Sequence, residues 1–169
     1  MSITRFMAKL LGGLLITGLV MCLAEGVLRV FKIGRPPPFF LVQKTSRGER
    51  LSINPDHIAR YFFYQPFQRI RMKPRQPWRR DMSRIKEPGT LRVIALGESS
   101  TQGFPHPRRI AFPAMTERML EIRHPNLRVE VINAGVVAIN SFAVLDIGKH
   151  MLDELAPDAL VVYAGHNEF

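Results

Sequence analysis

The chain has 169 residues, a formal net charge of +10 and a hydrophobic content of 46%. This length suffices for one domain, and the single cysteine, Cys22, excludes an intramolecular disulfide and a cysteine-based metal site. The excess of positive charge lies upstream of the part with globular periodicity. We therefore expect three segments: a membrane anchor over residues 1–32, a basic connector over 33–89 and a globular part over 90–169.

The first segment is predicted to cross a membrane once. The chain carries no charge from Leu10 to Ala24, and a span of about 20 apolar residues is reached if Glu25 and Arg29 lie near the far interface, where a charge costs less than at the bilayer centre. Residues 10–31 are thus predicted to contact membrane lipid. A cleaved signal peptide is the alternative. Basic residues flank both ends, so the positive-inside rule does not define the topology.

The second segment, residues 33–89, is rich in proline, arginine and aromatic residues and has no sustained periodicity. Its densest part, "RYFFYQPFQRIRMKPRQPWRRDMSRIK", is compatible with a solvated basic linker or with attraction to anionic headgroups, with the aromatics at the membrane interface. A third interpretation is a strand-like segment that packs its aromatics on the following domain. Binding to single-stranded nucleic acid by charge and stacking is disfavoured, and no nucleic-acid partner is expected.

The third segment predicts an open α/β sheet. The runs "LRVIAL", "LRVEVIN" and "DALVVYAG" are typical of strands. One helix is expected from Pro113 to before Pro125 and another over 141–155, each with apolar residues at helical spacing. The apolar stripe of the first helix consists of Phe112, Met115, Met119, Leu120 and Ile122. Strands that alternate with helices predict βαβ units and a parallel sheet, in which the third strand would keep an exposed apolar edge.

Three unusual turns follow the three strands, at the carboxyl ends where such sheets bind ligands. They read "GESSTQG", "NAGVVAINS" and "GHNE". Alone, the first turn is typical of a nucleophile, of a phosphate loop or of a helix cap. The second turn has small residues whose backbone N–H groups can approach a ligand, and the third brings the amide of Asn167. A hydroxyl that meets backbone and side-chain N–H donors predicts a nucleophile with an oxyanion hole.

In this order on successive strands, the three turns resemble the first three sequence blocks of the SGNH (GDSL-type) hydrolases. "ALGESSTQGFP", "VINAGVVAINSFAVLD" and "VVYAGHNEF" are similar to a membrane-anchored bacterial branch that often carries C-terminal tetratricopeptide repeats. The resemblance covers about residues 91–169. It implies a flavodoxin-like three-layer α/β fold, incomplete here with about three parallel strands and preceded by an N-terminal transmembrane helix. It also implies an ester hydrolase that acts on a small acyl ester without cofactor or metal, in the bacterial inner membrane with the C-terminal domain in the periplasm.

The resemblance also assigns roles to residues. Ser99 takes the position of the nucleophile, and its backbone N–H that of one oxyanion donor. The backbone N–H of Ala138, where the wider family has glycine, is implied as the second donor, and the side chain of Asn167 as the third. The residues implied to support these groups are Gly97, Glu98 and Gly135. Ser100 is then a neighbour with a capping role, and Glu98 and Glu168 stand where the wider family usually has Asp.

The general base of the family, the histidine of a final Asp-x-x-His block, has no counterpart, because no Asp-x-x-His occurs in the sequence. The substitutes are His106, His124, His150 and His166. His166 shares the rim with Asn167 and is the best placed, whereas His106 is expected on a surface loop and the other two in solvent near helix ends. We therefore expect an inactive first part of a longer hydrolase. The alternatives are a noncatalytic membrane-tethered binding or scaffold module and a flavodoxin-like phosphate-binding domain.

Overall fold

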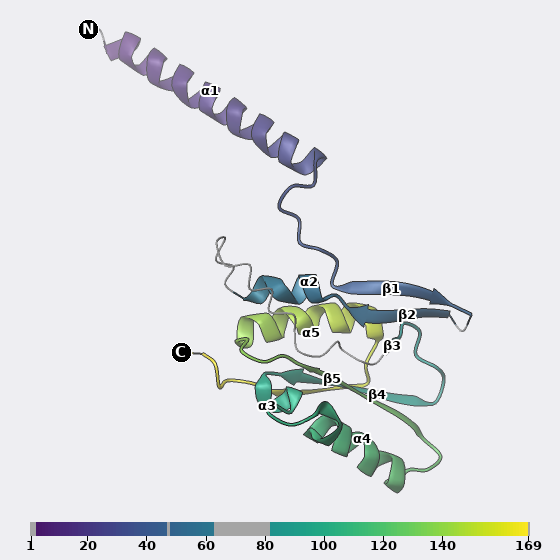
Figure 1. Ribbon diagram of the computed structural model, residues 1–169. Helices are drawn as coiled ribbons and strands as arrows, with labels where there is room; N and C mark the ends of the chain where they lie inside the picture. Colours follow the sequence, from purple (N-terminus) through teal and green to yellow (C-terminus); the bar gives the residue numbers. More distant parts are fainter. Residues whose placement is uncertain (1–2, 47, 63–81, 169) are drawn as a thin grey trace. The chain divides into compact units, whose positions relative to one another are not determined.

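The computed structural model describes residues 3–46, 48–62 and 82–168 (Figure 1). The chain divides into two compact units, Met1–Pro37 and Pro38–Phe169. The first boundary predicted from the sequence, at residue 32, thus lies five residues before the observed one. The second predicted boundary, at residue 89, falls inside the second unit.

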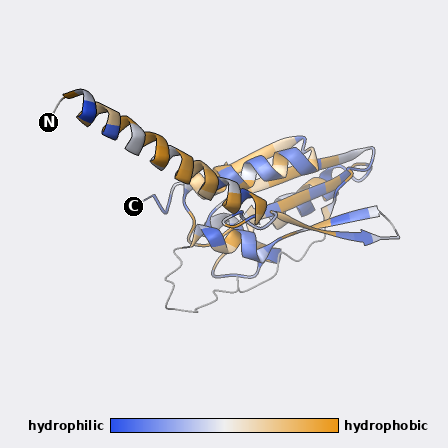
Figure 2. Ribbon diagram, turned by 90° about the horizontal axis from the view of Figure 1, so that it is seen from above, coloured by the Kyte–Doolittle hydropathy of each residue, from blue (hydrophilic) through white to orange (hydrophobic). Residues whose placement is uncertain are grey.

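The first unit is built on the helix α1, Ile3–Val30, in which no residue is buried. Its mean hydropathy reaches 2.0, and the helix is long and apolar enough to cross a membrane. Figure 2 shows apolar residues along most of its length and hydrophilic ones near its start. The Nε of Arg29 donates a hydrogen bond of 2.8 Å to Glu25 Oε1. The two charges that a span must tolerate are therefore paired with each other, as intramembrane charges usually are.

The second unit contains the predicted parallel sheet. Its strands are β4 (Thr90–Gly97), β5 (Arg128–Gly135) and β6 (Ala159–Tyr163), in the order β5-β4-β6. In this order, β5 lies on one side of β4 and β6 on the other, and both pairings are parallel. Among the described residues β6 pairs with β4 alone and is exposed along its whole length. The α/β fold class and the exposed third strand are as the sequence predicts.

Helices cover the two faces of this sheet and complete three layers (Figure 1). The helix α5, Ser141–Leu155, buries Ile147 and Met151 against Ile94 and Leu96 of β4. The helix α4, Phe112–Arg123, covers the other face, where Leu120 packs on a smaller cluster formed by Val93, Val129 and Val131. The main core therefore lies between the sheet and α5.

The apolar stripe predicted for α4 is confirmed at Leu120 and is wrong at Met115, Met119 and Ile122. Met119 and Ile122 are 68% and 67% exposed, and Met115 is exposed as well. The helix instead buries Glu117, whose Oε1 accepts a hydrogen bond of 3.1 Å from the backbone N–H of Val131. This bond supplies a partner to a backbone donor of β5, which pairs only with β4 in the described part of the chain. A polar bond to an edge strand thus decides which side of α4 faces inward.

The interpretation of residues 33–89 as a connector also needs correction. The described part of this segment forms a second, antiparallel sheet with the order β1-β2-β3. Its strands are β1 (Phe40–Thr45), β2 (Gly48–Ile53) and β3 (Met82–Ser83). The short helix α2, Pro55–Ile58, is capped by the Asn54 side chain, and a 3-10 turn, Ala59–Tyr61, follows it. In Figure 1 the hairpin and α2 lie beside α5, on the side away from the parallel sheet.

Apolar contacts join this segment to the domain. Phe39, Leu51, Ile53 and Ile58 are buried in the same core cluster as the inner face of α5. Burial of side chains of this size contributes about 1.5–3 kcal/mol each. Of the aromatics in the basic tract, Tyr61 and Phe62 are described, and both pack against this core cluster, as the third interpretation expects. The tract's other aromatics lie outside the described residues.

Ion pairs form at the same interface and account for part of the segment's positive charge. Arg60 pairs with Asp146, Arg84 with Glu154 and Lys86 with Asp158. All six side chains are partly exposed, and pairs of this kind contribute about 0–1 kcal/mol each, so the apolar contacts dominate. The remainder of the basic and aromatic tract, residues 63–81, lies outside the described residues, and with it the headgroup and nucleic-acid interpretations.

Candidate active site

The three turns singled out in the sequence begin at the same level of the sheet. Gly97, the last residue of β4, is in register with Gly135 on one neighbour and with Tyr163 on the other. Each quoted turn begins within two residues of one of these positions, so the parallel pairing brings all three together at one edge. The parallel pairing thus places the turns "GESSTQG", "NAGVVAINS" and "GHNE" at the same edge of the sheet.

The first turn leads into α3, a single helical turn over Ser99–Gln102. Ser99 is its first residue and is half-buried, while Ser100 is exposed. The N-cap of α3 is Glu98, and no side chain bonds the cap. The capping role expected for Ser100 is therefore wrong, because Ser100 lies inside the helix and not before it.

Two glycines allow the three turns to approach one another this closely. A Cβ on Gly97 would lie 2.0 Å from the carbonyl oxygen of Tyr163, and one on Gly135 would lie 2.3 Å from the backbone nitrogen of Gln102. Both neighbours are backbone atoms, which cannot move aside as the end of a flexible side chain can. The supporting positions predicted for Gly97 and Gly135 thus have a steric cause in the structure.

Glu98 connects the first turn to the third. Its side chain is 0% exposed, and its two carboxylate oxygens accept hydrogen bonds of 2.9 and 3.0 Å from the backbone N–H groups of Gly165 and His166. A carboxylate is acceptor-only and carries charge, so it satisfies two neighbouring donors with strong bonds. Glu98 therefore holds the backbone directly before Asn167 against the turn that carries Ser99.

Hydrogen bonds also link the third turn to the second. The Nδ2 of Asn167 donates a hydrogen bond of 2.9 Å to the carbonyl of Ile139, the residue after Ala138. Glu168 accepts bonds from the backbone N–H and the hydroxyl of Ser141, at 2.9 and 3.0 Å, at the start of α5. Glu98 and Glu168 thus both bind backbone donors of a neighbouring turn. The glutamate side chain, which is one methylene longer than that of aspartate, has the reach to do so.

Ala138 has a backbone conformation that explains the glycine of the wider family. Its φ is 59°, in the left-handed region that costs residues with a Cβ roughly 1–2 kcal/mol. Glycine enters this region at no such cost. The turn therefore requires a left-handed residue at this position, and the chain accepts an alanine there at the expense of some strain.

Sequence reasoning overlooked two polar residues, Thr101 and Arg108, that bind backbone carbonyls beside the turns. The hydroxyl of Thr101 donates to the carbonyl of Tyr163 at 3.0 Å. The guanidinium of Arg108 donates to the carbonyls of Asn133 and Gly135 at 2.9 and 2.8 Å, and burial lowers the pKa of Arg108 to about 10. Nothing in "FPHPRR" distinguishes this arginine from its exposed neighbour, because only the tertiary contact with the end of β5 does so.

The histidines considered as general bases have different surroundings. His166 lies at the rim, 49% exposed, with its Nδ1 3.7 Å from Glu98 Oε2, and its ring meets that of Tyr163 edge to face. His106 and His124 are exposed, as expected. The prediction that His150 is solvated is wrong, because its ring stacks on Phe39 with 4.6 Å between the centroids. The structure shows no hydrogen bond between Ser99 and a histidine among the residues it describes.

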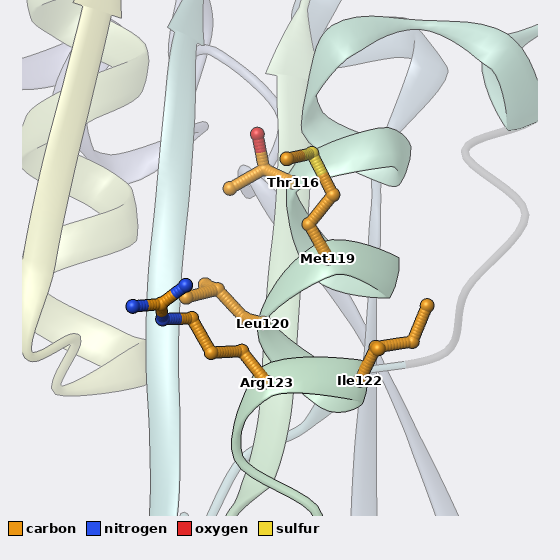
Figure 3. Close-up of a pocket in the computed structure, with 5 residues that line it drawn as sticks. All are labelled: Thr116, Met119, Leu120, Ile122 and Arg123. Atoms are coloured by element: carbon orange, nitrogen blue, oxygen red, sulfur yellow. The ribbon is translucent and has the colours of Figure 1, made fainter.

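A shallow apolar hollow on the surface of α4 lies apart from these turns. It is lined by Thr116, Met119, Leu120, Ile122 and Arg123, all from this helix (Figure 3). None of the residues of the three turns contributes to it. The hollow follows from the outward orientation of Met119 and Ile122 and plays no part in the arrangement around Ser99.

Comparison with known proteins gives a partial match. No protein-family model matches the chain, and no curated protein matches it. Among solved structures, it is similar to AlinE4, described as an SGNH-hydrolase family esterase, with 28% identity and a TM-score of 0.41. A point mutant of the same esterase matches with the same values. The match covers 50% of this chain and 43% of that protein, so the chain spans less than half of the esterase's length.

Proposed function

We propose that residues 90–169 form the nucleophile-bearing part of an SGNH-type ester hydrolase that acts through Ser99. The observation that carries this proposal is the clamp made by Glu98, whose buried carboxylate binds the backbone of Gly165 and His166. The clamp links the turn of the proposed nucleophile to the turn of Asn167, so that a hydroxyl and an amide from different strands lie at one rim.

In the proposed reaction, the Ser99 hydroxyl attacks the carbonyl carbon of a small acyl ester and gives up its proton to a base. The negative charge that develops on the carbonyl oxygen is stabilised by the backbone N–H groups of Ser99 and Ala138 and by the amide of Asn167. The Asn167 amide has two N–H groups; one donates to Ile139, and the other is the proposed donor to the oxyanion. The alcohol then leaves, and water hydrolyses the acyl-enzyme.

The described residues do not supply the general base. A general base must lie within hydrogen-bonding reach of the hydroxyl proton, and the resemblance implies the histidine of an Asp-x-x-His block, which residues 1–169 do not contain. We therefore expect activity in a longer gene product that includes such a block, and no Ser99-dependent turnover in the 169-residue chain. A noncatalytic binding module is the second candidate, and it would show no turnover in either form.

The phosphate-binding alternative is disfavoured by the hydrogen bonds at the rim. A phosphate loop presents several free backbone N–H groups to its ligand. Here the donors of Gly165 and His166 bind Glu98, that of Gly135 binds the side chain of Asn133, and that of Val136 binds the carbonyl of Gly97. With these donors engaged, the second and third turns offer a phosphate group fewer free N–H groups.

For location, we propose that α1 anchors the protein in the bacterial inner membrane with residues 38–169 in the periplasm. The support is a helix of 28 residues with only Arg5, Lys9, Glu25 and Arg29 charged, the last two being paired. The protein should remain with membranes after a carbonate wash and should keep its N-terminus. Soluble protein that begins near Glu25 would show a processed signal peptide instead.

Labelling with a fluorophosphonate probe tests the assignment of the nucleophile. In a longer product that contains an Asp-x-x-His block, labelling should disappear in Ser99→Ala and persist in Ser100→Ala, which is a matched control because it removes the adjacent, exposed hydroxyl. The opposite pattern would overturn the assignment. A longer product that contains the Asp-x-x-His block, is folded and yet remains unlabelled would support the noncatalytic module.

A further inference from the structure

A second cluster of chemically versatile side chains lies outside the three turns, between α2 and α5. Asp146 and His150 are four residues apart on α5, and His57 comes from α2. One potential ligand atom from each of the three lies within 4.8 Å of the others. The hydroxyl of Tyr61 donates a hydrogen bond of 2.6 Å to Asp146 Oδ2. Spacing of four residues on a helix places two ligands on one face, as in helical metal sites.

The surroundings of the cluster hold the two imidazoles in place. His57 is 2% exposed, and its ring centroid lies 5.1 Å from that of His150, with the planes nearly perpendicular. Phe39 stacks on His150 and meets His57 edge to face at 5.1 Å. The side chains therefore converge in a partly enclosed space with an aromatic wall, where a bound ion would be shielded from water on one side.

We propose that His57, Asp146 and His150 bind a divalent transition-metal ion, Zn²⁺ in particular, which joins the segment before the parallel sheet to α5. Two imidazoles and one carboxylate are a donor set that suits zinc, whereas Ca²⁺ and Mg²⁺ prefer oxygen donors alone. A water molecule or the phenol oxygen of Tyr61 would complete a tetrahedral coordination. Because zinc bonds to nitrogen and oxygen are about 2.0–2.2 Å long, the three side chains must draw together around the ion.

Arg60 opposes such an ion and makes the proposal easy to test. Its Nη2 donates a hydrogen bond of 2.8 Å to Asp146 Oδ2, and its side chain is partly exposed and lies over the Tyr61 ring. An arginine at this place repels a metal cation and competes for the carboxylate. Removal of Arg60 should therefore strengthen metal binding. If Asp146 served only as the ion-pair partner of Arg60, the removal would break that pair and would not strengthen metal binding.

A metal at this place would act on the fold and not on the proposed hydrolysis. It would connect His57, next to the buried Ile58, with α5, whose first residue Ser141 binds Glu168. An ion that binds the folded state alone raises its stability. The readout is therefore metal binding and thermal unfolding, neither of which depends on Ser99.

The experiment uses the full 169-residue chain, purified in detergent and freed of metal with a chelator. Titration with Co²⁺ should give the visible absorption bands of a tetrahedral site at one ion per chain, and Zn²⁺ should displace the cobalt. Zn²⁺ should also raise the midpoint of thermal unfolding. We expect His57→Gln and His150→Gln to lose both effects, and Arg60→Gln to bind Co²⁺ at least fivefold more tightly. His124→Gln, which alters an exposed histidine, is the control and should bind like the wild type.

The proposal is overturned if the wild-type chain binds neither ion, or if binding persists in His57→Gln and in His150→Gln. Weaker binding in Arg60→Gln would also overturn it. Circular dichroism first establishes that each variant is folded, because His57 is buried and its replacement can destabilise the chain. If His57→Gln does not fold, metal binding by the His150→Gln and Arg60→Gln variants decides the result, because both residues are partly exposed. His124→Gln remains the reference.

Discussion

Replacement of Glu98 by glutamine tests the clamp on which the candidate site depends. The substitution keeps the volume of the side chain, which is 0% exposed. It leaves one carbonyl oxygen to accept a bond, while the new amide N–H₂ faces the second backbone donor, either that of Gly165 or that of His166. One of the two bonds is therefore lost, and the other is no longer made to a charged group.

The size of the effect follows from these two bonds. Hydrogen bonds to charged groups contribute about 1.5–3 kcal/mol each and neutral ones about 1 kcal/mol. Two offsets reduce the gross loss: glutamine avoids the cost of burying a carboxylate, and Gly165 and His166 are exposed, so water can bind their freed N–H groups. We expect a net loss of about 2 kcal/mol in the free energy of unfolding, which shifts the urea midpoint by about 1 M at a typical m-value.

Urea unfolding of the 169-residue chain measures this loss, and Glu121→Gln is the matched control. Glu121 is an exposed glutamate of α4 that pairs with Arg118, so its replacement should change stability by less than about 0.5 kcal/mol. In a longer product that contains an Asp-x-x-His block, Glu98→Gln should also slow fluorophosphonate labelling at least tenfold, because Asn167 loses its support and one oxyanion donor accounts for about 10²–10³ in rate. A Glu98→Gln variant as stable and as reactive as the Glu121→Gln control would refute the clamp.

Three further predictions concern the rest of the second unit. Leu51→Ala should lower the free energy of unfolding by about 2–5 kcal/mol in urea titrations, because Leu51 is buried in the common core; a change below 0.5 kcal/mol would mean that residues 38–62 are only a linker. Ala138→Gly should leave the free energy of unfolding nearly unchanged, because relief of about 1–2 kcal/mol of strain is offset by glycine's greater flexibility in the unfolded chain. Ala138→Val should clearly lower the free energy of unfolding. Equal stability of the two variants would argue against the left-handed φ. The hydrogen bonds from Lys86 and from the backbone of Arg92 lower the pKa of Asp158. Its stabilising contribution is therefore present above about pH 4 and is lost as the pH falls through the lower folded-state pKa. Asp158→Asn should reduce the loss of unfolding free energy at acid pH, and an unchanged acid dependence would contradict the assignment.

The sequence alone determined the elements whose signals are local. Apolar runs predicted β4, β5 and β6, helical spacing predicted α4 and α5, and hydropathy predicted the long first helix, because each depends on residues close together in the chain. The order of the three turns also placed Ser99, Ala138 and Asn167 at one edge, since the carboxyl ends of parallel strands must lie on the same side. The pairing of Gly97 with Gly135 and Tyr163 places the ends of the three strands at one edge.

Tertiary structure decided everything that depends on partners far away in the chain. Residues 38–62 lack periodicity, yet they fold because Phe39, Leu51 and Ile58 find an apolar surface on α5. Glu117 of α4 faces inward, ahead of the more apolar Met119, because it binds an N–H group of an edge strand. Neither His57 nor Arg108 stands out in the sequence, since burial and neighbours give a polar side chain its role, and both arise only when distant segments pack together.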